Sequence, residues 1–237
     1  MRWQQNIRSR STANLATTSA MKLYRFRYSP YARKVQMVLD LLGATHDVIE
    51  VAYGERNELA ALTGGYIHVP VLVLDGGEVL VESRAICERL IATDPARRLV
   101  PSGLDGPVWA YCDFLDGPVE DVLFRIASPG VRESWKTPWE RALYTLIKER
   151  KFGAGCVDLW RDQQDALIAR ARDLLAATGR TLEARPFVFG ETVSLADAAL
   201  YGLWAMLDCA GDVLGRIDPR LVDHARRVEA AAARAAR

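Results

Sequence analysis

The stretch MKLYRFRYSPYARKVQMVLDLLG, residues 21–43, decides the fold class of this chain. Its first part, residues 22–28, alternates aliphatic or aromatic side chains with basic ones, which predicts a half-buried strand. Ser29 then suits a helix N-cap and Pro30 the first helical position, while Gly43 supplies a C-terminal stop. The sequence therefore predicts a strand, a cap and an amphipathic helix in direct succession.

The segments that follow continue this alternation. We expect further strands at 46–51, 71–74 and 78–81, and further helices at 55–63 and 83–92. The first two strands can pair in parallel across the first helix, and the last two form an antiparallel hairpin around Asp75-Gly76-Gly77. This βαβαββα order is the order of an α/β thioredoxin-like domain.

The remainder of the chain reads as helical. Residues 93–106 hold prolines, glycines and polar side chains that break both periodicities, which is typical of a linker. Helices are expected at about 107–127, 136–157, 160–178, 194–213 and 219–236. We therefore expect a thioredoxin-like domain over 21–92, a linker over 93–106, and an all-α helical-bundle domain over 107–237.

The first twenty residues differ from the rest, because they are basic and rich in Ser and Thr, with no acidic residue. Three interpretations stay open for residues 1–20: a disordered or mis-assigned extension, a short organelle-type targeting peptide, or a tail left by expression. The first is the expectation, since Met21 begins the first patterned element.

Composition excludes several classes of protein. The 237 residues are 50% hydrophobic and 26% charged with a net charge of +1, which argues against a nucleic-acid partner. The longest apolar stretches are far too short to span a bilayer. The cysteines lack metal-site or disulfide-framework spacing, so we expect no metal, no membrane partner and a reducing, cytoplasmic location. These cysteines are Cys87, Cys112, Cys156 and Cys209.

Ser29 is the first candidate for chemistry. It stands where a strand meets a helix N-terminus, and backbone N–H groups with the helix dipole favour an anion there. Lowering a thiol pKa of about 8.5 by about 2 units requires roughly 2.7 kcal/mol. A hydroxyl hydrogen bond to the anion and a helix terminus together supply about that much. The alternative is that Ser29 only caps the helix.

Two further segments can bind an extended peptide ligand. His68-Val69-Pro70 directly precedes a strand, and a cis bond there would turn the Val69 backbone outward, although a trans proline that starts a strand is the simpler alternative. Glu82 and Ser83 lie between a strand and a helix, with Ser83 as the expected N-cap. They offer a carboxylate for an ammonium group and N–H donors for a carboxylate. Simple capping is the alternative.

These segments, taken in order, resemble the cytosolic glutathione S-transferase superfamily. The resemblance spans residues 22 to about 210 and rests on the joint spacing of five segments. They are Tyr24 to Arg33, His68 to Leu72, Glu82 to Ile86, Phe189-Gly190, and Ser194-Leu195-Ala196-Asp197, the last a capping box interpreted as structural.

The resemblance implies a role for each site residue. Ser29 matches the active-site serine of theta- and zeta-like classes, which hydrogen-bonds the glutathione sulfur. Val69 would pair with the cysteinyl backbone before a cis-Pro70. Glu82 and Ser83 would hold the γ-glutamyl end, and His68 stands where relatives carry Lys or Gln for the glycyl end. The turn at residues 64–67 and the residues after Ser29 depart from the common forms, so no class is assigned.

We therefore expect a homodimeric glutathione transferase that conjugates the thiolate of glutathione to a small apolar electrophile, a detoxification chemistry. Two alternatives stay open: a protein of this fold that binds without turnover, and a glutathione-dependent reductase or isomerase. The absence of cysteine between residues 22 and 86 argues against thiol-type members. The co-substrate pocket is expected to hold Tyr28, Tyr31, Trp109, Asp113 and Phe114, with Arg25, Arg27 or Arg125 as acceptors of an anionic group.

Overall fold

A computed structural model describes residues 21–96 and 98–237, so the expectations for residues 1–20 lie outside the described residues. The first part of the chain forms a four-stranded mixed sheet in the order β2-β1-β3-β4. β1 pairs in parallel with β2, whereas β3 is antiparallel to both β1 and β4, as the sequence predicts. The strands are β1 (Met21–Arg25), β2 (His46–Glu50), β3 (Val71–Val73) and β4 (Val79–Val81).

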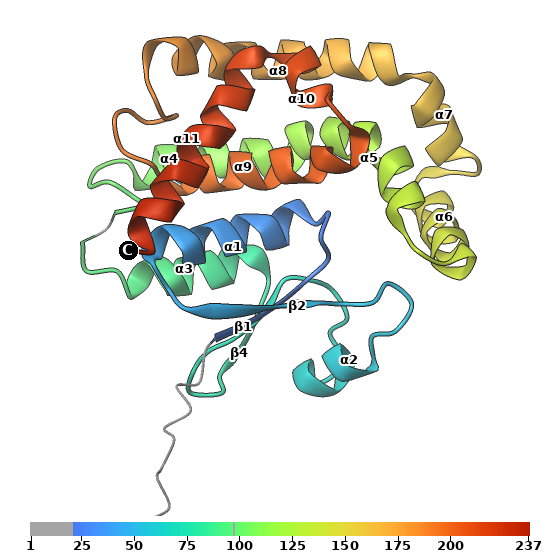
Figure 1. Ribbon diagram of the computed structural model, residues 1–237, viewed down its shortest axis with the longest axis horizontal. Coiled ribbons are helices and arrows are strands. Elements are labelled where there is room, and N and C mark those ends of the chain that lie inside the picture. The colour runs from blue at the N-terminus through green and yellow to red at the C-terminus, as the bar shows by residue number, and fades with distance from the viewer. Residues whose placement is uncertain (1–20, 97) are drawn as a thin grey trace, which may run out of the picture.

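Three helices accompany this sheet. α1 (Pro30–Leu42) and α3 (Ser83–Ala92) cover the face toward the helical part of the chain, and α2 (Asn57–Thr63) lies on the other side (Figure 1). The predicted signals at both ends of α1 are confirmed. Ser29 is its N-cap, Pro30 is its first residue, and Gly43 ends it with a φ of 68°.

Two predicted boundaries in this part are wrong. The first strand ends at Arg25 rather than residue 28, because the Ser29 N–H donates to the Phe26 carbonyl oxygen at 3.0 Å and turns the chain out of the sheet. Ser83 is the first residue of α3 rather than its N-cap, which is Glu82.

The second part of the chain is mostly helical, which confirms the expected fold class. The helix end predicted near residue 127 is wrong, because the helical backbone continues past Pro129. Pro118 lies within the π-helix η1 and Pro129 within α5, and helix continues to Ser134. The elements are α4 (Asp105–Phe114), η1 (Leu115–Val119), α5 (Glu120–Ser134), α6 (Pro138–Phe152), α7 (Cys156–Asp162), α8 (Gln164–Ala184), α9 (Leu195–Leu207), the 3₁₀-helix η2 (Asp208–Ala210), α10 (Val213–Ile217) and α11 (Pro219–Ala235).

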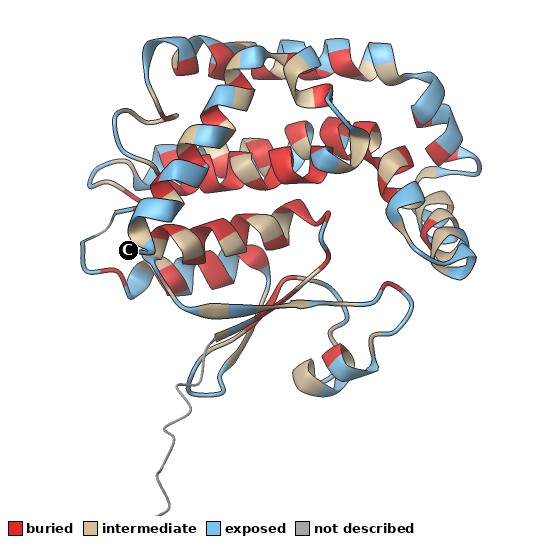
Figure 2. Ribbon diagram, in the orientation of Figure 1, coloured by how far each residue is buried: buried red, intermediate tan, exposed pale blue. Residues whose placement is uncertain are grey.

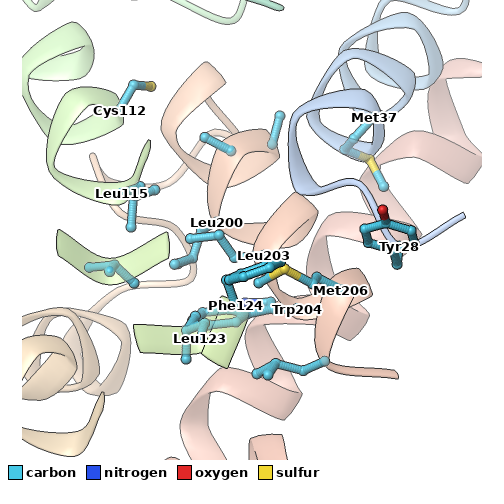
Figure 3. Packing of buried hydrophobic residues seen from close by; sticks show 14 of the residues in the cluster. Tyr28, Met37, Cys112, Leu115, Leu123, Phe124, Leu200, Leu203, Trp204 and Met206 are labelled. Carbon is cyan, nitrogen blue, oxygen red and sulfur yellow. The ribbon is translucent and has the colours of Figure 1, made fainter. Parts of the chain in front are cut away.

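The two parts pack against each other chiefly through α1 and α9. Both helices are rich in buried residues (Figure 2), and Met37 of α1 lies in one hydrophobic cluster with Leu203 and Met206 of α9 (Figure 3). Gly202 permits a close approach, because a Cβ there would lie 2.4 Å from the Pro30 carbonyl oxygen. The start of α1 is therefore in direct contact with α9.

No helix among the described residues combines the length and the apolar character that crossing a bilayer requires.

Candidate functional site

The three segments singled out in the sequence meet at one end of the sheet. β1 is antiparallel to β3, so the end of β1 and the start of β3 lie at the same end of the sheet. β4 is antiparallel to β3, with Val81 paired to Val71, so Glu82, which follows Val81, also lies at this end of the sheet. The structure thus brings together the connection holding Ser29, the His68-Val69-Pro70 segment and the start of α3.

Ser29 is buried, with 6% of its surface exposed. Its Oγ accepts a hydrogen bond from the Ala32 N–H at 3.3 Å, so the capping interpretation holds. The hydroxyl hydrogen has no acceptor among the described residues. Because a serine hydroxyl both donates and accepts, capping leaves the O–H free to donate to an anion.

The electrostatics of this end favour negative charge. The first turns of α1 and α3 contain no acidic residue, so no side chain there offsets the partial positive charge of either helix N-terminus. The first turn of α1 includes Arg33, with Lys34 directly after it. Two helix N-termini therefore face one end of the sheet without a neutralising carboxylate in their first turns.

The segment before β3 presents unpaired backbone. The Val69–Pro70 peptide bond is cis, Pro70 is buried and His68 is exposed. Among hydrogen bonds between described residues, none involves the Val69 N–H or C=O. These two groups can pair with an extended ligand in the manner of an added strand.

Glu82 and Ser83 occupy the turn from β4 into α3. Glu82 has a φ of 67°, which residues other than glycine rarely adopt, and such strain of about 1–3 kcal/mol tends to occur at ligand sites. The Tyr66 hydroxyl donates to Glu82 Oε1 at 3.0 Å, and the Tyr66 ring lies 5.4 Å from the His68 ring. Burial, followed by this bond to Glu82, raises the pKa of Tyr66 to about 12. Tyr66 therefore fixes the Glu82 carboxylate beside the 68–70 segment.

An aromatic cluster closes the site from the helical side. It consists of Phe26, Tyr28, Tyr53, Trp135 and Tyr144. Tyr28 stacks on Phe26 at 5.7 Å, and its ring lies 6.1 Å from that of Tyr144. Burial raises the pKa of Tyr28 well above its usual value, so this predicted pocket residue is a neutral phenol within packed rings.

The start of α1 is fastened to η1. The Tyr31 hydroxyl donates to the Asp116 carbonyl oxygen at 3.3 Å, and Lys34 Nζ lies 2.5 Å from Asp116 Oδ2. Lys34 is 2% exposed, so this carboxylate is the ionic partner of a buried ammonium group. Tyr31, also predicted to line the pocket, thus lies beside η1 and helps to hold the helix that Ser29 caps.

The other predicted pocket residues fall into separate groups. Trp109 and Asp113 lie under Arg84 of α3, whose guanidinium is 4.5 Å from the Trp109 ring and 2.8 Å from Asp113 Oδ1. Phe114 instead contacts Tyr111 at 5.9 Å. No hydrogen bond, ion pair or ring contact between described side chains joins these three residues to Tyr28.

Arg56 is a site residue that the sequence reasoning missed. Its Nη1 donates to the Ile67 carbonyl oxygen at 3.0 Å, and its guanidinium lies 4.9 Å from the Phe26 ring. A cation is thereby fixed next to His68, where a ligand carboxylate can bind. The sequence around Arg56 carries no motif, and only the fold places it there.

The cysteines are poorly suited to act at this site. Burial raises the pKa of Cys87 and of Cys112 to about 12, which suppresses the reactive thiolate. Both lie buried on α3 and α4. A cavity of about 400 Å³ is also remote from Ser29, because it is lined by Leu42 and Ala44 at the far end of α1.

Comparisons with known proteins point to one family. Residues 23–98 match the model of the glutathione S-transferase N-terminal domain. The probable glutathione S-transferase GSTU6 of Oryza sativa subsp. japonica is 26% identical over 215 residues, which cover 90% of this chain and 81% of that protein. Glutathione S-transferase omega-1 of Sus scrofa is 30% identical over 92 residues, covering 39% of this chain and only 37% of that protein.

Solved structures show the same fold over most of the chain. Glutathione transferase GSTFuA3 from Phanerochaete chrysosporium superposes with a TM-score of 0.77 at 17% identity, covering 91% of this chain and 98% of that one. Glutaredoxin 2 from Salmonella typhimurium, solved in complex with glutathione, gives 0.73 at 19% identity, covering 91% and 95%. Residues 23–98 thus belong to the glutathione S-transferase N-terminal domain family, and the chain as a whole has the fold of the glutathione transferases.

Proposed function

We propose that this protein is a glutathione transferase in which Ser29 stabilises the glutathione thiolate. The observation that carries the proposal is the Ser29 hydroxyl, which accepts from the Ala32 N–H and keeps its own hydrogen for a ligand. In the proposed complex the γ-glutamyl end lies at Glu82 and Ser83, and the cysteinyl backbone pairs with Val69. The glycyl carboxylate lies between His68 and Arg56.

The proposed chemistry is addition of the thiolate to an electrophilic carbon. The thiol proton goes to solvent, the sulfur forms the C–S bond, and a leaving group departs with its electron pair where the electrophile carries one. Ser29 contributes by donating to the sulfur, and the uncompensated start of α1 adds to the preference for the anion. The thiolate is thereby held in position for attack.

Ser29→Ala tests this role. Loss of a hydrogen bond to an anion, about 1.5–3 kcal/mol, is expected to raise the pKa of bound glutathione by about 1–2 units and to lower kcat/KM about 10- to 100-fold. The pKa is measured from the ultraviolet absorbance of the bound thiolate, and Ser29→Thr, which keeps a hydroxyl, is the matched control. Unchanged thiol pKa and turnover in Ser29→Ala would exclude Ser29 from the chemistry.

The same measurements address the two alternatives. A binding protein without turnover would bind glutathione by calorimetry and leave a chlorodinitrobenzene unreacted. A reductase acting through its own thiol would lose activity on mixed disulfides when its cysteines are alkylated, yet the raised pKa values of Cys87 and Cys112 disfavour that route.

A further inference from the structure

Lys148 of α6 is a half-buried cation without an ionic partner. Its Nζ lies 4.8 Å from the centroid of the Phe124 ring and 4.9 Å from that of Tyr144. Aromatic faces attract an ammonium group but do not neutralise its charge. Within residues 21–96 and 98–237, no carboxylate oxygen lies within 4.0 Å of this nitrogen.

The charges around Lys148 are mostly positive. Lys151 on the same helix and Arg56 from the loop before α2 add to it, and Glu120 at the start of α5 opposes it. Burial raises the pKa of Glu120 to about 7, so this carboxyl is only partly ionised at neutral pH. Burial, with the nearby Lys151, lowers the pKa of Lys148 to about 8. A negatively charged ligand group would relieve this excess of positive charge.

This cation lies at the Ser29 end of α1. Tyr144, which Lys148 contacts, packs against Tyr28, and Ser29 is the next residue in the chain. Glu120 directly follows η1, to which Tyr31 is hydrogen-bonded. In Figure 1, α5 and α6 stand on the side of the molecule toward which the N-terminal end of α1 points.

The arginines suggested by the sequence are engaged elsewhere. Arg25 pairs with Glu50 at 2.6 Å, and Arg125 pairs with Asp121 at 2.8 Å. Arg27 is exposed and near Asp208, which follows α9. Arg27 precedes Tyr28 in the chain and has no ion pair among the described residues, but its side chain is exposed. Lys148, by contrast, is half-buried against the rings of Phe124 and Tyr144.

We propose that the electrophilic co-substrate carries an anionic group, such as a carboxylate, and that Lys148 binds it beside Phe124 and Tyr144. This inference rests on the proposed transferase function. It replaces the expectation of a purely apolar electrophile by an aromatic or aliphatic compound with one acidic substituent. Lys148 then determines specificity and does not act on the reacting bond.

The experiment compares two electrophiles that share one leaving group, chlorodinitrobenzene and its carboxylate derivative chlorodinitrobenzoate. Lys148→Met is expected to lower the ratio of kcat/KM for the benzoate to that for the benzene about 10- to 100-fold, as for loss of a charge-assisted hydrogen bond. The change should lie in KM for the benzoate. Lys148→Arg should retain the ratio, and Arg150→Met, at an exposed position of α6, is the matched control.

The pH profile of this ratio provides a second readout. Lys148 is protonated below pH 8 and neutral above it, so the wild-type ratio should fall as pH rises through about 8. The groups facing Lys148 are Glu120, Lys151, Arg56 and Cys156. Ionisation of Glu120 near pH 7 would begin the fall earlier, and Glu120→Gln should remove that early part. In Lys148→Met the ratio should no longer fall near pH 8.

Affinities for the two glutathione conjugates, measured by calorimetry, give the same ratio without turnover. An unchanged ratio in Lys148→Met, or an equal rise in KM for glutathione with both electrophiles, would overturn the inference while leaving the transferase function intact. If the wild-type protein neither turns over the electrophiles nor binds either conjugate, the proposed function fails and this inference fails with it.

Discussion

Among the described residues, two helices have a serine at the N-cap, and the two serines are bonded in opposite ways. At the start of α9, the Ser194 hydroxyl donates to Asp197 Oδ2 at 2.7 Å and the Ser194 N–H donates to the same oxygen at 2.9 Å. At the start of α1, the Ser29 hydroxyl only accepts, and the first turn holds no acid. The Ser194 hydroxyl is satisfied by Asp197 within the chain. Ser29 keeps its hydroxyl hydrogen, and α1 keeps its positive N-terminus, for a ligand.

The surroundings of the two caps differ in the same sense. Asp197 is fully buried and also accepts from the Val188 N–H and from His224 Nε2, both at 2.9 Å. The indole of Trp204 donates to His224 Nδ1, which leaves His224 Nε2 to donate to Asp197. This cap ties α9 to α11 and to the chain before α9. The comparison shows that an N-cap serine keeps its O–H for another acceptor only where its own helix supplies no carboxylate, as at Ser29.

The largest effect is expected on breaking the cap at Ser194. Asp197→Asn places an amide among N–H and O–H donors, and loss of one partner in a buried charged network costs about 3–5 kcal/mol. Urea denaturation should show that loss of stability, with glutathione affinity of the folded fraction unchanged. Asp165→Asn, on a side chain that is 95% exposed, is the control and should change little. If Asp197→Asn lost no more stability than Asp165→Asn, the hydrogen bonds of Asp197 would not be important for the stability of the fold.

A smaller effect is expected on removing the Ser194 hydroxyl. Ser194→Ala should cost about 1 kcal/mol of stability, the usual value for an N-cap, and should leave the bound thiol pKa and kcat/KM at wild-type values. Measured beside Ser29→Ala, it separates capping from chemistry, since both variants lose a cap but only one loses a ligand donor. Equal losses of activity in the two variants would contradict this separation.

The smallest effect is expected on giving α1 an acid in its first turn. Arg33→Glu places a carboxylate at the helix N-terminus, where it interacts with the dipole by about 0.3–1 kcal/mol. That carboxylate opposes a second anion, so the pKa of bound glutathione should rise by a fraction of a unit to about one unit. Gln36→Glu, one turn later, is the control. A thiol pKa that does not respond would indicate that the helix end contributes nothing beyond Ser29.

Local signals in the sequence predicted much of the first domain. Ser29, Pro30 and Gly43 encode the bounds of α1 because capping and turn chemistry act within a few residues. The end of β1 at Arg25 was not predictable from alternation, because packing of Phe26 and Tyr28 in the aromatic cluster decides it. A local sequence pattern does not reveal such tertiary packing.

The residues of the candidate site also divide into those that the sequence predicted and those that it did not. The connection holding Ser29, the His68-Val69-Pro70 segment and the start of α3 were recognised from their spacing and capping residues. The predicted strand order places all three at one end of the sheet. Tyr66, Arg56 and Lys148 gave no signal, since each enters the site through a long-range contact. The helix end predicted near residue 127 was wrong, because the helical backbone of α5 continues through Pro129 to Ser134.

The missing side chain at Gly202 has a mechanical consequence. A single methyl group there would already overlap the Pro30 carbonyl oxygen, so no slack remains between α9 and the first turn of α1. Because of this contact, α1 can tilt away from α9 but cannot move closer to it. The first turn of α1, which Ser29 caps, therefore cannot be displaced toward α9 to make room for a bulky reactant.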